Sequence, residues 1–493
     1  MSAARATRPD QRRVRVAIVG AGFGGIGMAI ALKRAGHDDF VVLDKAPEIG
    51  GVWRDNTYPG AACDIPSALY SYSFAPRYRW SRRYAPQPEI LDYLRSCVRA
   101  HRVEPHLRLG QEVVDAAFDE DRALWCLRTA AGRTVEAEVF IAACGQLSRP
   151  AVPAIRGADA FAGRSFHSSR WDHEHDLTGR RVAVIGTGAS ALQIVPAIAE
   201  QVGHLTVFQR SAPHVVPKWD RNFPPRPQGA LRQKAARLGW WLFNESLVSG
   251  LTRRWPTIAL TRRGCEAQLR TLSDPLLRQR LTPTTEIGCK RVGISSSYYP
   301  ALERPDVTLV TEPIAEITAD AIHTEDGTRH TVDTIVYATG FATTEFLSSL
   351  RVRGRDGVEL SQVWREGAHA YLGMAVPYFP NMFLVYGPHT NIGAGSAVYM
   401  IESQIRYIRA AIDELRCGRR QFLEVRPEAA QDFDAEMTRR TRRSVWATCT
   451  SWYRHASGRV TNNWPGQTLE YRRRTARLDL AHYRPAVPRP RRP

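Results

Sequence analysis

Two stretches of the chain combine short apolar runs, glycine-rich loops and amphipathic segments in the same order. In the first stretch, the β-branched run at residues 14–19 predicts a buried parallel strand, and a glycine-rich loop follows at residues 20–25. Residues 26–34 then predict a helix, and the apolar residues 40–43 predict a second strand. This order of strand, loop, helix and strand is one βαβ unit, which indicates an α/β fold with a parallel sheet.

The same pattern recurs in the middle of the chain. Residues 181–185 predict a strand, residues 186–191 a loop, residues 192–200 a helix and residues 205–208 a further strand. The two units lie too far apart in sequence to form a tandem repeat. They indicate two separate nucleotide-binding domains of the Rossmann type in one chain.

The first loop carries the spacing G-x-G-x-x-G at Gly20, Gly22 and Gly25. The first glycine permits a tight turn, the second lets the backbone approach a pyrophosphate, and the third lets the helix pack on the strand. The helix N-terminus then offers free N–H groups to the phosphates. Asp44 stands at the end of the second strand, where its carboxylate can accept hydrogen bonds from a ribose. These features predict a dinucleotide site.

The second loop differs at its strand end. It keeps small residues at Gly186 and Gly188 and places Ser190 before the helix, but Arg210 and Ser211 stand where the first unit has an acid. A carboxylate would repel the extra phosphate of NADP, whereas a guanidinium and a hydroxyl would bind it. We therefore expect NADPH, and not NADH, at this loop.

Two dinucleotide sites in one chain imply that electrons pass from a nicotinamide to a flavin. A strand ending in Ala-Thr-Gly, with Gly340 as its glycine, resembles the segment that returns the chain to the FAD domain in two-dinucleotide flavoproteins. The first site is therefore expected to bind FAD, and the second NADPH.

A longer motif lies between the two loops. The pattern Phe161-x-Gly163-x-x-x-His167-x-x-x-Trp171-Asp172 resembles the fingerprint of type I Baeyer–Villiger monooxygenases. The resemblance runs from about residue 14 to residue 475. Further matches to the family are Gly50-Gly51-Val52-Trp53, Tyr58-Pro59-Gly60, Cys63-Asp64, Lys290-Arg291, Gly387-Pro388 and Asn391.

The resemblance implies a reaction and a set of residue roles. Family members insert one oxygen atom beside a ketone carbonyl through a C4a-peroxyflavin, giving an ester or lactone. Arg291 matches the active-site arginine, whose positive charge would stabilise the developing negative charge, and Asp64 matches the carboxylate that orients it. Lys290 matches a lysine that supports Arg210 at the NADP 2′-phosphate. An N- or S-oxygenating flavin monooxygenase on the same scaffold remains the alternative.

Other matched residues are implied to hold FAD or to link the domains. Gly51, Trp53 and Asp64 are expected at the FAD, and the fingerprint histidine is expected at the hinge between the domains, not as a general base. Trp452 resembles a late aromatic residue near the substrate pocket, with core packing as the open alternative. The segment from residue 210 to residue 290 is shorter than in many cyclic-ketone monooxygenases, which leaves the substrate range open.

The fold class expected is therefore α/β, with two Rossmann-like dinucleotide-binding domains, for FAD and NADPH, and a helical insertion in the NADPH domain. The expected division of the chain is a basic disordered tail at 1–13, the first part of the FAD domain at 14–150, the NADPH domain at 151–335 with its insertion at about 213–282, the second part of the FAD domain at 336–475, and an Arg/Pro-rich tail at 476–493.

Charge and cysteine content change this picture little. The 493 residues include 68 basic and 49 acidic ones, a net charge of +19, which raises the alternative of a nucleic-acid-binding protein. The basic residues are nearly all arginine and many lie near the ends, so we expect no nucleic-acid partner. Eight scattered cysteines, with no C-x-x-C pair, predict free thiols, no metal site and no disulfide reductase.

No run of residues approaches the ~20 apolar residues of a membrane span, and no signal core follows the basic N-terminus. We therefore expect a cytoplasmic protein that has no membrane partner and takes a small ketone and O2 as substrates. The sequence leaves the oligomeric state open.

Overall fold

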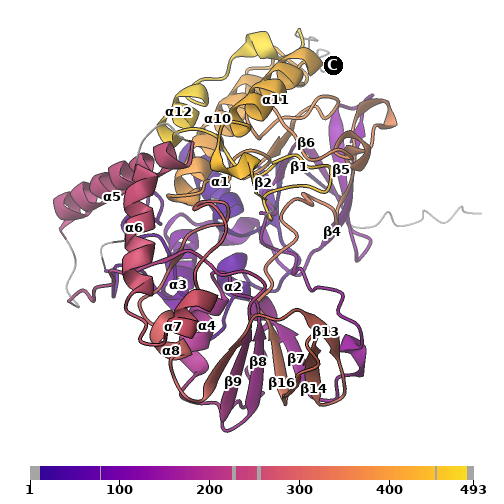
Figure 1. Ribbon diagram of the computed structural model, residues 1–493. Helices are drawn as coiled ribbons and strands as arrows, with labels where there is room; N and C mark the ends of the chain where they lie inside the picture. The colour runs from indigo at the N-terminus through magenta and orange to yellow at the C-terminus, as the bar shows by residue number, and fades with distance from the viewer. Residues whose placement is uncertain (1–10, 78, 225–228, 253–256, 450–451, 486–493) are drawn as a thin grey trace, which may run out of the picture.

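The structure is a computed structural model that describes residues 11–77, 79–224, 229–252, 257–449 and 452–485 (Figure 1). Its larger domain is built on an eight-stranded sheet in which β18 (Met382–Leu384) lies beside β6. The other strands follow in the order β17 (Arg351–Arg353), β4 (Val113–Asp119), β5 (Leu124–Thr129), β6 (Thr134–Ala142), β1 (Gln11–Val19), β2 (Phe40–Leu43) and β3 (Leu107–Arg108).

Both faces of this sheet are covered. Along β1, Val16 and Ile18 point to one face and join the core shared with the helices, whereas Ala17 and Val19 point to the opposite core. Both faces of a parallel sheet are buried, which explains why this strand is a nearly continuous apolar run. The helices on the first face are α1 (Phe23–Arg34), α3 (Gln87–Ala100) and α10 (Ala397–Arg416).

The smaller domain contains a five-stranded parallel sheet, at the bottom of Figure 1. Its strands follow in the order β12 (Val307–Val310), β9 (His204–Phe208), β8 (Arg181–Ile185), β16 (Thr334–Tyr337) and β7 (Arg164–His167). The helices α4 (Ala191–Ile198) and α8 (Tyr298–Leu302) pack on it. A three-stranded antiparallel sheet joins this domain, formed by β13 (Ile314–Ile317), β14 (Ala321–Thr324) and β15 (Arg329–Thr331).

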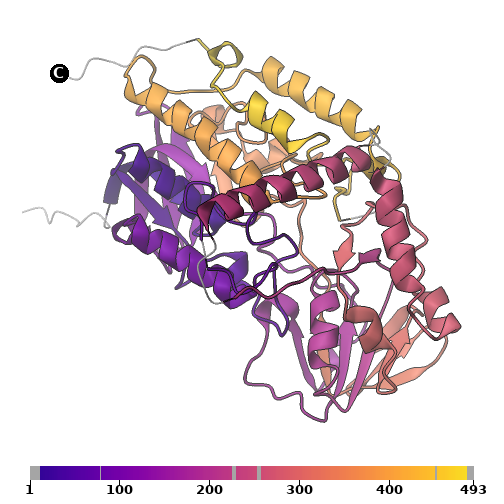
Figure 2. The ribbon, with the colours of Figure 1, turned by 90° about the vertical axis from the view of Figure 1, so that its left-hand side faces the viewer.

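A helical segment follows the first half of the smaller domain. It begins after β10 (Val215–Val216), ends before β11 (Gly293–Ile294), and these two short strands pair in parallel. Between them lie α5 (Ala230–Leu251), α6 (Thr257–Leu269) and α7 (Pro275–Arg280). Figures 1 and 2 show α5 reaching across to the larger domain and α6 returning toward the smaller one.

The remaining helices lie mainly on the larger domain, where α11 (Pro427–Thr441) and α12 (Thr468–Arg474) accompany α10. Two short helices, α2 (Val52–Asp55) and α9 (Leu360–Val363), lie in loops. Short 3₁₀ turns occupy Glu104–His106, Ala158–Ala160, Ser168–Arg170, Arg355–Gly357, Val445–Ala447 and Leu480–His482.

The five-stranded parallel sheet and the mixed eight-stranded sheet, in which β1 pairs in parallel with β2 and β6, confirm the expected α/β fold class. The strands predicted at 40–43 and 181–185 have the same bounds as β2 and β8. The expected tails, however, extend too far inward. Residues 11–13 belong to β1 and pair with β6.

The C-terminal tail also begins later than its composition predicts. Within residues 476–485, Tyr483 is buried with its hydroxyl 3.0 Å from that of Tyr407, and Arg484 forms an ion pair with Glu424 at 2.9 Å. The high Arg and Pro content of this segment predicted a disordered tail. Composition does not indicate the contact of Tyr483, because that contact depends on one tyrosine and a residue far away in the sequence. The rest of both expected tails, residues 1–10 and 486–493, lies outside the described residues.

Candidate active site between two dinucleotide cradles

The first glycine-rich loop makes a turn that excludes side chains. Gly20 has φ +110°, and a Cβ placed on it would lie 2.4 Å from the carbonyl oxygen of Ala143. A Cβ on Gly25 would lie 1.8 Å from the oxygen of Gly20. Gly22 and Gly51 approach so closely that a Cβ on Gly51 would lie 3.1 Å from the Cα of Gly22. The loop is thus bare backbone at the N-terminus of α1, as a pyrophosphate requires.

Asp44 lies beside this loop and is almost fully buried. Its carboxylate accepts hydrogen bonds from the backbone N–H of Ala21 at 2.7 Å and of Ala46 at 2.9 Å, and Arg54 lies 3.4 Å away. A carboxylate has about four lone-pair sites, so acceptor capacity remains for a ribose hydroxyl. Trp53, on α2, donates its indole N–H to the hydroxyl of Tyr70 at 3.0 Å. These residues fit FAD.

The second loop repeats the geometry at the end of β8. Gly186 has φ +113°, and a Cβ there would lie 2.5 Å from the carbonyl oxygen of Ala338. A Cβ on Gly188 would meet no heavy atom within 4 Å, so the backbone there is open to a ligand. The side chain of Ser190 makes no capping hydrogen bond at the start of α4. Gly340 has φ +81° and is likewise open.

Two basic residues lie near this second loop without a carboxylate. Lys290 donates a hydrogen bond from Nζ to Oγ of Ser211. Burial lowers the pKa of Lys290, and the neighbouring positive charge of Arg210 lowers it further. Within the described ranges, neither Lys290 nor Arg210 forms an ion pair. A cluster of two cations and a hydroxyl fits a phosphate group, as the 2′-phosphate of NADP provides.

Arg291 follows directly in the chain and faces the other domain. Its Nε donates to Oδ2 of Asp64 at 2.6 Å, although the two residues are 227 positions apart. Burial lowers the pKa of Arg291, but the charge and hydrogen bond of Asp64 outweigh burial and raise it overall. The guanidinium is therefore permanently charged. About a quarter of each side chain stays exposed, so the pair is not sealed from a substrate.

Two tyrosines, the partly buried Tyr386 and the buried Tyr453, interact electrostatically with this guanidinium. The hydroxyl of Tyr386 donates to Asn391 at 2.7 Å, which holds the ring in place. Trp452 lies against Tyr453, with ring centroids 4.0 Å apart, and is 39% exposed. Tyr453 is therefore more deeply buried than Trp452, the residue that the family resemblance suggested for the substrate pocket.

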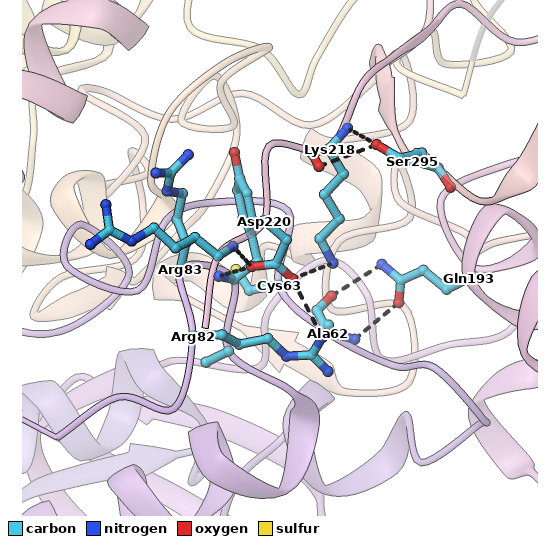
Figure 3. A network of polar contacts seen from close by, with 12 residues as sticks. Ala62, Cys63, Arg82, Arg83, Gln193, Lys218, Asp220 and Ser295 are labelled. Atoms are coloured by element: carbon cyan, nitrogen blue, oxygen red, sulfur yellow. Dashed lines mark hydrogen bonds and ion pairs between the residues drawn. The ribbon is translucent and has the colours of Figure 1, made fainter. Parts of the chain in front are cut away.

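A set of polar contacts joins the two domains around Ala62, which stands two residues before Asp64 in the chain (Figure 3). Asp220, on the chain leading to α5, accepts from the N–H of Tyr84 at 3.3 Å and pairs with Arg82 at 3.4 Å and Lys218 at 3.8 Å. The amide of Gln193 on α4 donates to the carbonyl of Ala62 at 3.1 Å. In return, the Ala62 N–H donates to the Gln193 side-chain oxygen at 3.0 Å. These contacts connect the two domains. The spacing of the residues in the sequence did not predict them.

The fingerprint residues lie where the chain passes between the domains. His167 ends β7, and its Nε2 lies 2.9 Å from the carbonyl oxygen of Gly340, so this nitrogen carries the proton. Its Nδ1 accepts from the backbone N–H of Ser169 at 3.2 Å. Burial lowers the pKa of His167, which keeps the ring neutral. The hydrogen bond from His167 thus connects β7, near the start of the smaller domain, to Gly340 in the segment that returns to the larger domain.

The other fingerprint residues support this crossing. A Cβ on Gly163 would lie 2.4 Å from the carbonyl oxygen of Asp333, and Phe161 packs in the adjoining core. Trp171 meets Phe166 edge to face, and Asp172 pairs with Arg164 at 2.7 Å.

The cysteines depart from the expectation of free thiols. Cys289 and Cys449 form a disulfide with Cα atoms 5.7 Å apart, across a sequence separation of 160. The spacing rules that predict disulfides or redox pairs consider near neighbours, so this pair left no signal. The bond joins the residue before Lys290 and Arg291 to the segment before Trp452 and Tyr453. It therefore links two walls of the site.

The fold and the site together define a flavoprotein oxidoreductase with two dinucleotide-binding domains. Consistent with this class, residues 17–224 match the pyridine nucleotide-disulphide oxidoreductase family. In the part of the chain that the structure describes, no helix is long and apolar enough to cross a membrane, and no group of three or more His, Cys, Asp or Glu residues forms a candidate metal site.

Curated relatives narrow the class. A Baeyer–Villiger monooxygenase of Streptomyces coelicolor is 43% identical over 97% of this chain and 93% of its own length. A Baeyer–Villiger monooxygenase of Pseudomonas aeruginosa is 40% identical over 98% of this chain and 94% of its own length. The chain belongs to the Baeyer–Villiger monooxygenase family. It is an FAD-dependent NADPH monooxygenase.

Solved structures agree. A steroid monooxygenase bound to NADP superimposes with a TM-score of 0.83 at 33% identity, covering 94% of this chain and 97% of that one. A cyclohexanone monooxygenase in its closed form gives a TM-score of 0.85 at 27% identity, covering 97% of this chain and all of that one. These matches do not favour the N- or S-oxygenating alternative.

Proposed function

We propose that the chain inserts one atom of O2 beside the carbonyl of an apolar ketone, giving an ester or lactone, with NADPH as the electron donor. The observation that carries this proposal is the ion pair between Asp64 and Arg291, which brings a fixed guanidinium to the junction of the two dinucleotide cradles. Oxygen insertion builds negative charge on the reacting oxygens, and a preorganised cation stabilises it.

Each cradle has a separate task in this proposal. Bound FAD supplies the oxygen-activating chemistry once NADPH has reduced it. Asp44 and the first glycine loop would hold its adenosine and pyrophosphate, and Trp53 and Asp64 would lie toward its ring. Lys290, Arg210 and Ser211 hold the 2′-phosphate that distinguishes NADPH from NADH.

Arg291 acts on the substrate side. Because Asp64 takes its Nε, the two terminal nitrogens of the guanidinium remain available for the oxygen atoms of the substrate. Of these two nitrogens, Nη1 lies 3.5 Å from the carbonyl oxygen of Ile392. This hydrogen bond is long and weak, so a substrate oxygen can replace the carbonyl. Asp64 is a positioning residue in this scheme, and His167 holds the hinge between the domains.

The wall near Arg291 suits an apolar substrate. Leu251, Val445, Trp446 and Tyr453 form a buried apolar cluster there, and Trp452 stands at its edge. Solved relatives are named for cyclohexanone and for steroids, so alicyclic and polycyclic ketones are the first compounds to test.

The test is NADPH oxidation by the yellow, FAD-loaded protein against linear, cyclic, aromatic and polycyclic ketones, with the products identified. A parallel panel of amines and sulfides tests the alternative. We expect esters or lactones from at least one ketone class. Turnover of amines or sulfides with no ketone oxidised would overturn the proposal.

Arg291→Ala separates the reaction from cofactor binding. Removing one preorganised stabilising group typically costs about 10²- to 10³-fold in rate, so ester formation should fall by that factor while the flavin absorbance stays. The matched control is Arg128→Ala, an exposed arginine on β5. Ester formation by Arg291→Ala at the control's rate would exclude this guanidinium from the reaction.

A further inference from the structure

Helix α5 exposes a row of leucines. Leu231, Leu238 and Leu242 are spaced seven and four residues apart, which places them on one side of the helix, and they are 82%, 56% and 54% exposed. Phe243 beside them is 43% exposed, and the adjoining α6 exposes Leu260. We call the three α5 leucines the leucine stripe.

The remaining surface of α5 and its C-terminal half contact the protein through both polar and apolar groups, and Trp240 and Trp241 pack against the core of the larger domain. Gln233 donates to the carbonyl of Arg77, and Glu245 accepts from the N–H of Thr468 at 3.0 Å. Ser249 accepts from Gln467 at 3.0 Å. A surface helix normally buries its apolar side and exposes its polar side. The leucine stripe instead lies outside the contacts that α5 makes with the protein.

The exposed side of α5 is also basic. Arg232 and Lys234 stand on either side of the leucine stripe and are exposed, whereas Glu245, the only acidic residue of α5, is buried. Neighbouring α6 adds exposed Arg262 and Arg263, against one exposed acid, Glu266. An apolar stripe flanked by cations is the pattern of a helix that lies in the surface of an anionic bilayer.

We propose that α5, with its leucine stripe and flanking cations, binds the surface of a membrane containing anionic lipid. The sequence led us to expect no membrane partner because no segment is long enough to span one; a helix lying in the interface needs no such length. Figure 1 shows α5 at the left-hand side of the molecule, and Figure 2 shows it crossing the face that is turned toward the viewer.

A second copy of the chain is the competing occupant. Two copies that meet through the same helix would bring Arg232 and Lys234 close to their own equivalents, and each copy carries a net charge of +19. Anionic headgroups neutralise these charges, whereas self-association brings them together. Charge complementarity therefore favours lipid.

The position of α5 gives such binding a consequence. Its C-terminal residue, Leu251, packs with Val445, Trp446 and Tyr453 in the apolar cluster near Arg291. One helix thus extends from the leucine stripe to the wall of the active site. Lipid binding itself does not depend on the proposed reaction, so the two can fail separately.

The experiment is cosedimentation of the FAD-loaded protein with vesicles of phosphatidylglycerol or of phosphatidylcholine. We expect binding to phosphatidylglycerol that weakens with salt, and little binding to phosphatidylcholine. The combined change Leu231→Ser, Leu238→Ser and Leu242→Ser should weaken partitioning at least tenfold. Replacing Arg232 and Lys234 by Gln should weaken it about fivefold for each charge removed.

Leu276→Ser is the matched control, because Leu276 is 56% exposed on α7, away from the stripe. It should bind vesicles like the unaltered protein, and all variants should keep their flavin absorbance. The proposal fails if the unaltered protein stays in the supernatant with phosphatidylglycerol, or if the triple leucine variant sediments equally well. It also fails if ultracentrifugation without lipid shows a dimer that the leucine variant abolishes.

Discussion

Asp64 offers the sharpest test of how the guanidinium of Arg291 is held. Asp64→Asn removes the negative charge but keeps an oxygen that can accept from Nε of Arg291, whereas Asp64→Ala removes both. If Asp64 works by orienting Arg291, ester formation should fall for Asn and fall further for Ala. FAD content should remain that of the unaltered protein.

The size of the effect follows from the geometry. The Nε–Oδ2 distance of 2.6 Å puts the two charge centres about 4 Å apart, where the attraction is about 4 kcal/mol at an effective dielectric constant of about 20. The side chains are 28% and 27% exposed, so solvent screening reduces the usable part to about half, or about 2 kcal/mol. That corresponds to a loss of about 30-fold in kcat/KM for Asp64→Asn.

The assay measures ester formed per NADPH consumed together with kcat/KM for the ketone. We expect Asp64→Asn to consume NADPH while yielding less ester, because Arg291 is no longer held against the reacting oxygens. Asp92→Asn is the control, since Asp92 pairs with Arg77 on the surface. Ester formation by Asp64→Asn at the control's rate would refute the positioning role. Loss of FAD would show instead that Asp64 serves the cofactor.

Three further outcomes are expected. Cys449→Ser removes a disulfide across 160 residues, for which chain entropy suggests a loss of stability of up to about 5 kcal/mol. Calorimetry should show a lower Tm, equal to that of the reduced unaltered protein. An unchanged Tm would contradict the disulfide. Lys290→Ala should raise the KM for NADPH about tenfold and leave that for NADH alone, since only NADPH carries the 2′-phosphate; equal effects on both would remove this role. Burial lowers the pKa of His389 from 6.5 to about 4. On acidification, this histidine is therefore protonated at a higher pH in the unfolded chain than in the folded protein. Its contribution to stability is therefore present above about pH 6.5 and lost as the pH falls toward 4; urea unfolding at pH 7 and pH 5 checks this, and an equal free energy of unfolding would disprove it.

Most of the fold could be predicted from local sequence patterns. The short apolar runs at 40–43 and 181–185, rich in β-branched residues, predicted strands that a parallel sheet buries on both faces. Gly20 and Gly186 identified their turns because no residue with a Cβ fits beside Ala143 or Ala338. In both cases the cause lies within a few residues of the effect.

Contacts between distant segments were beyond such reasoning. Asp64 and Arg291 came to attention only through the family resemblance, and nothing in the spacing of Cys289 and Cys449 suggested a bond. The sequence also did not indicate which residues of α5 stay exposed. Its leucines resemble a core stripe, but in the structure Leu231, Leu238 and Leu242 lie at the surface.

The position of Asp64 and Arg291 on opposite domains explains why the interdomain contacts matter for the chemistry. Asp64 follows the loop that Gln193 holds through Ala62, and Arg291 precedes β11, which β10 holds in register. A separation of even about 1 Å between these segments would weaken the pair, because a charged hydrogen bond at 2.6 Å loses its alignment quickly. The guanidinium is therefore fixed only while the domains are in contact. Since the nicotinamide and flavin cradles belong to those same domains, the contact that would bring the two cofactors together also positions the charge for oxygen insertion.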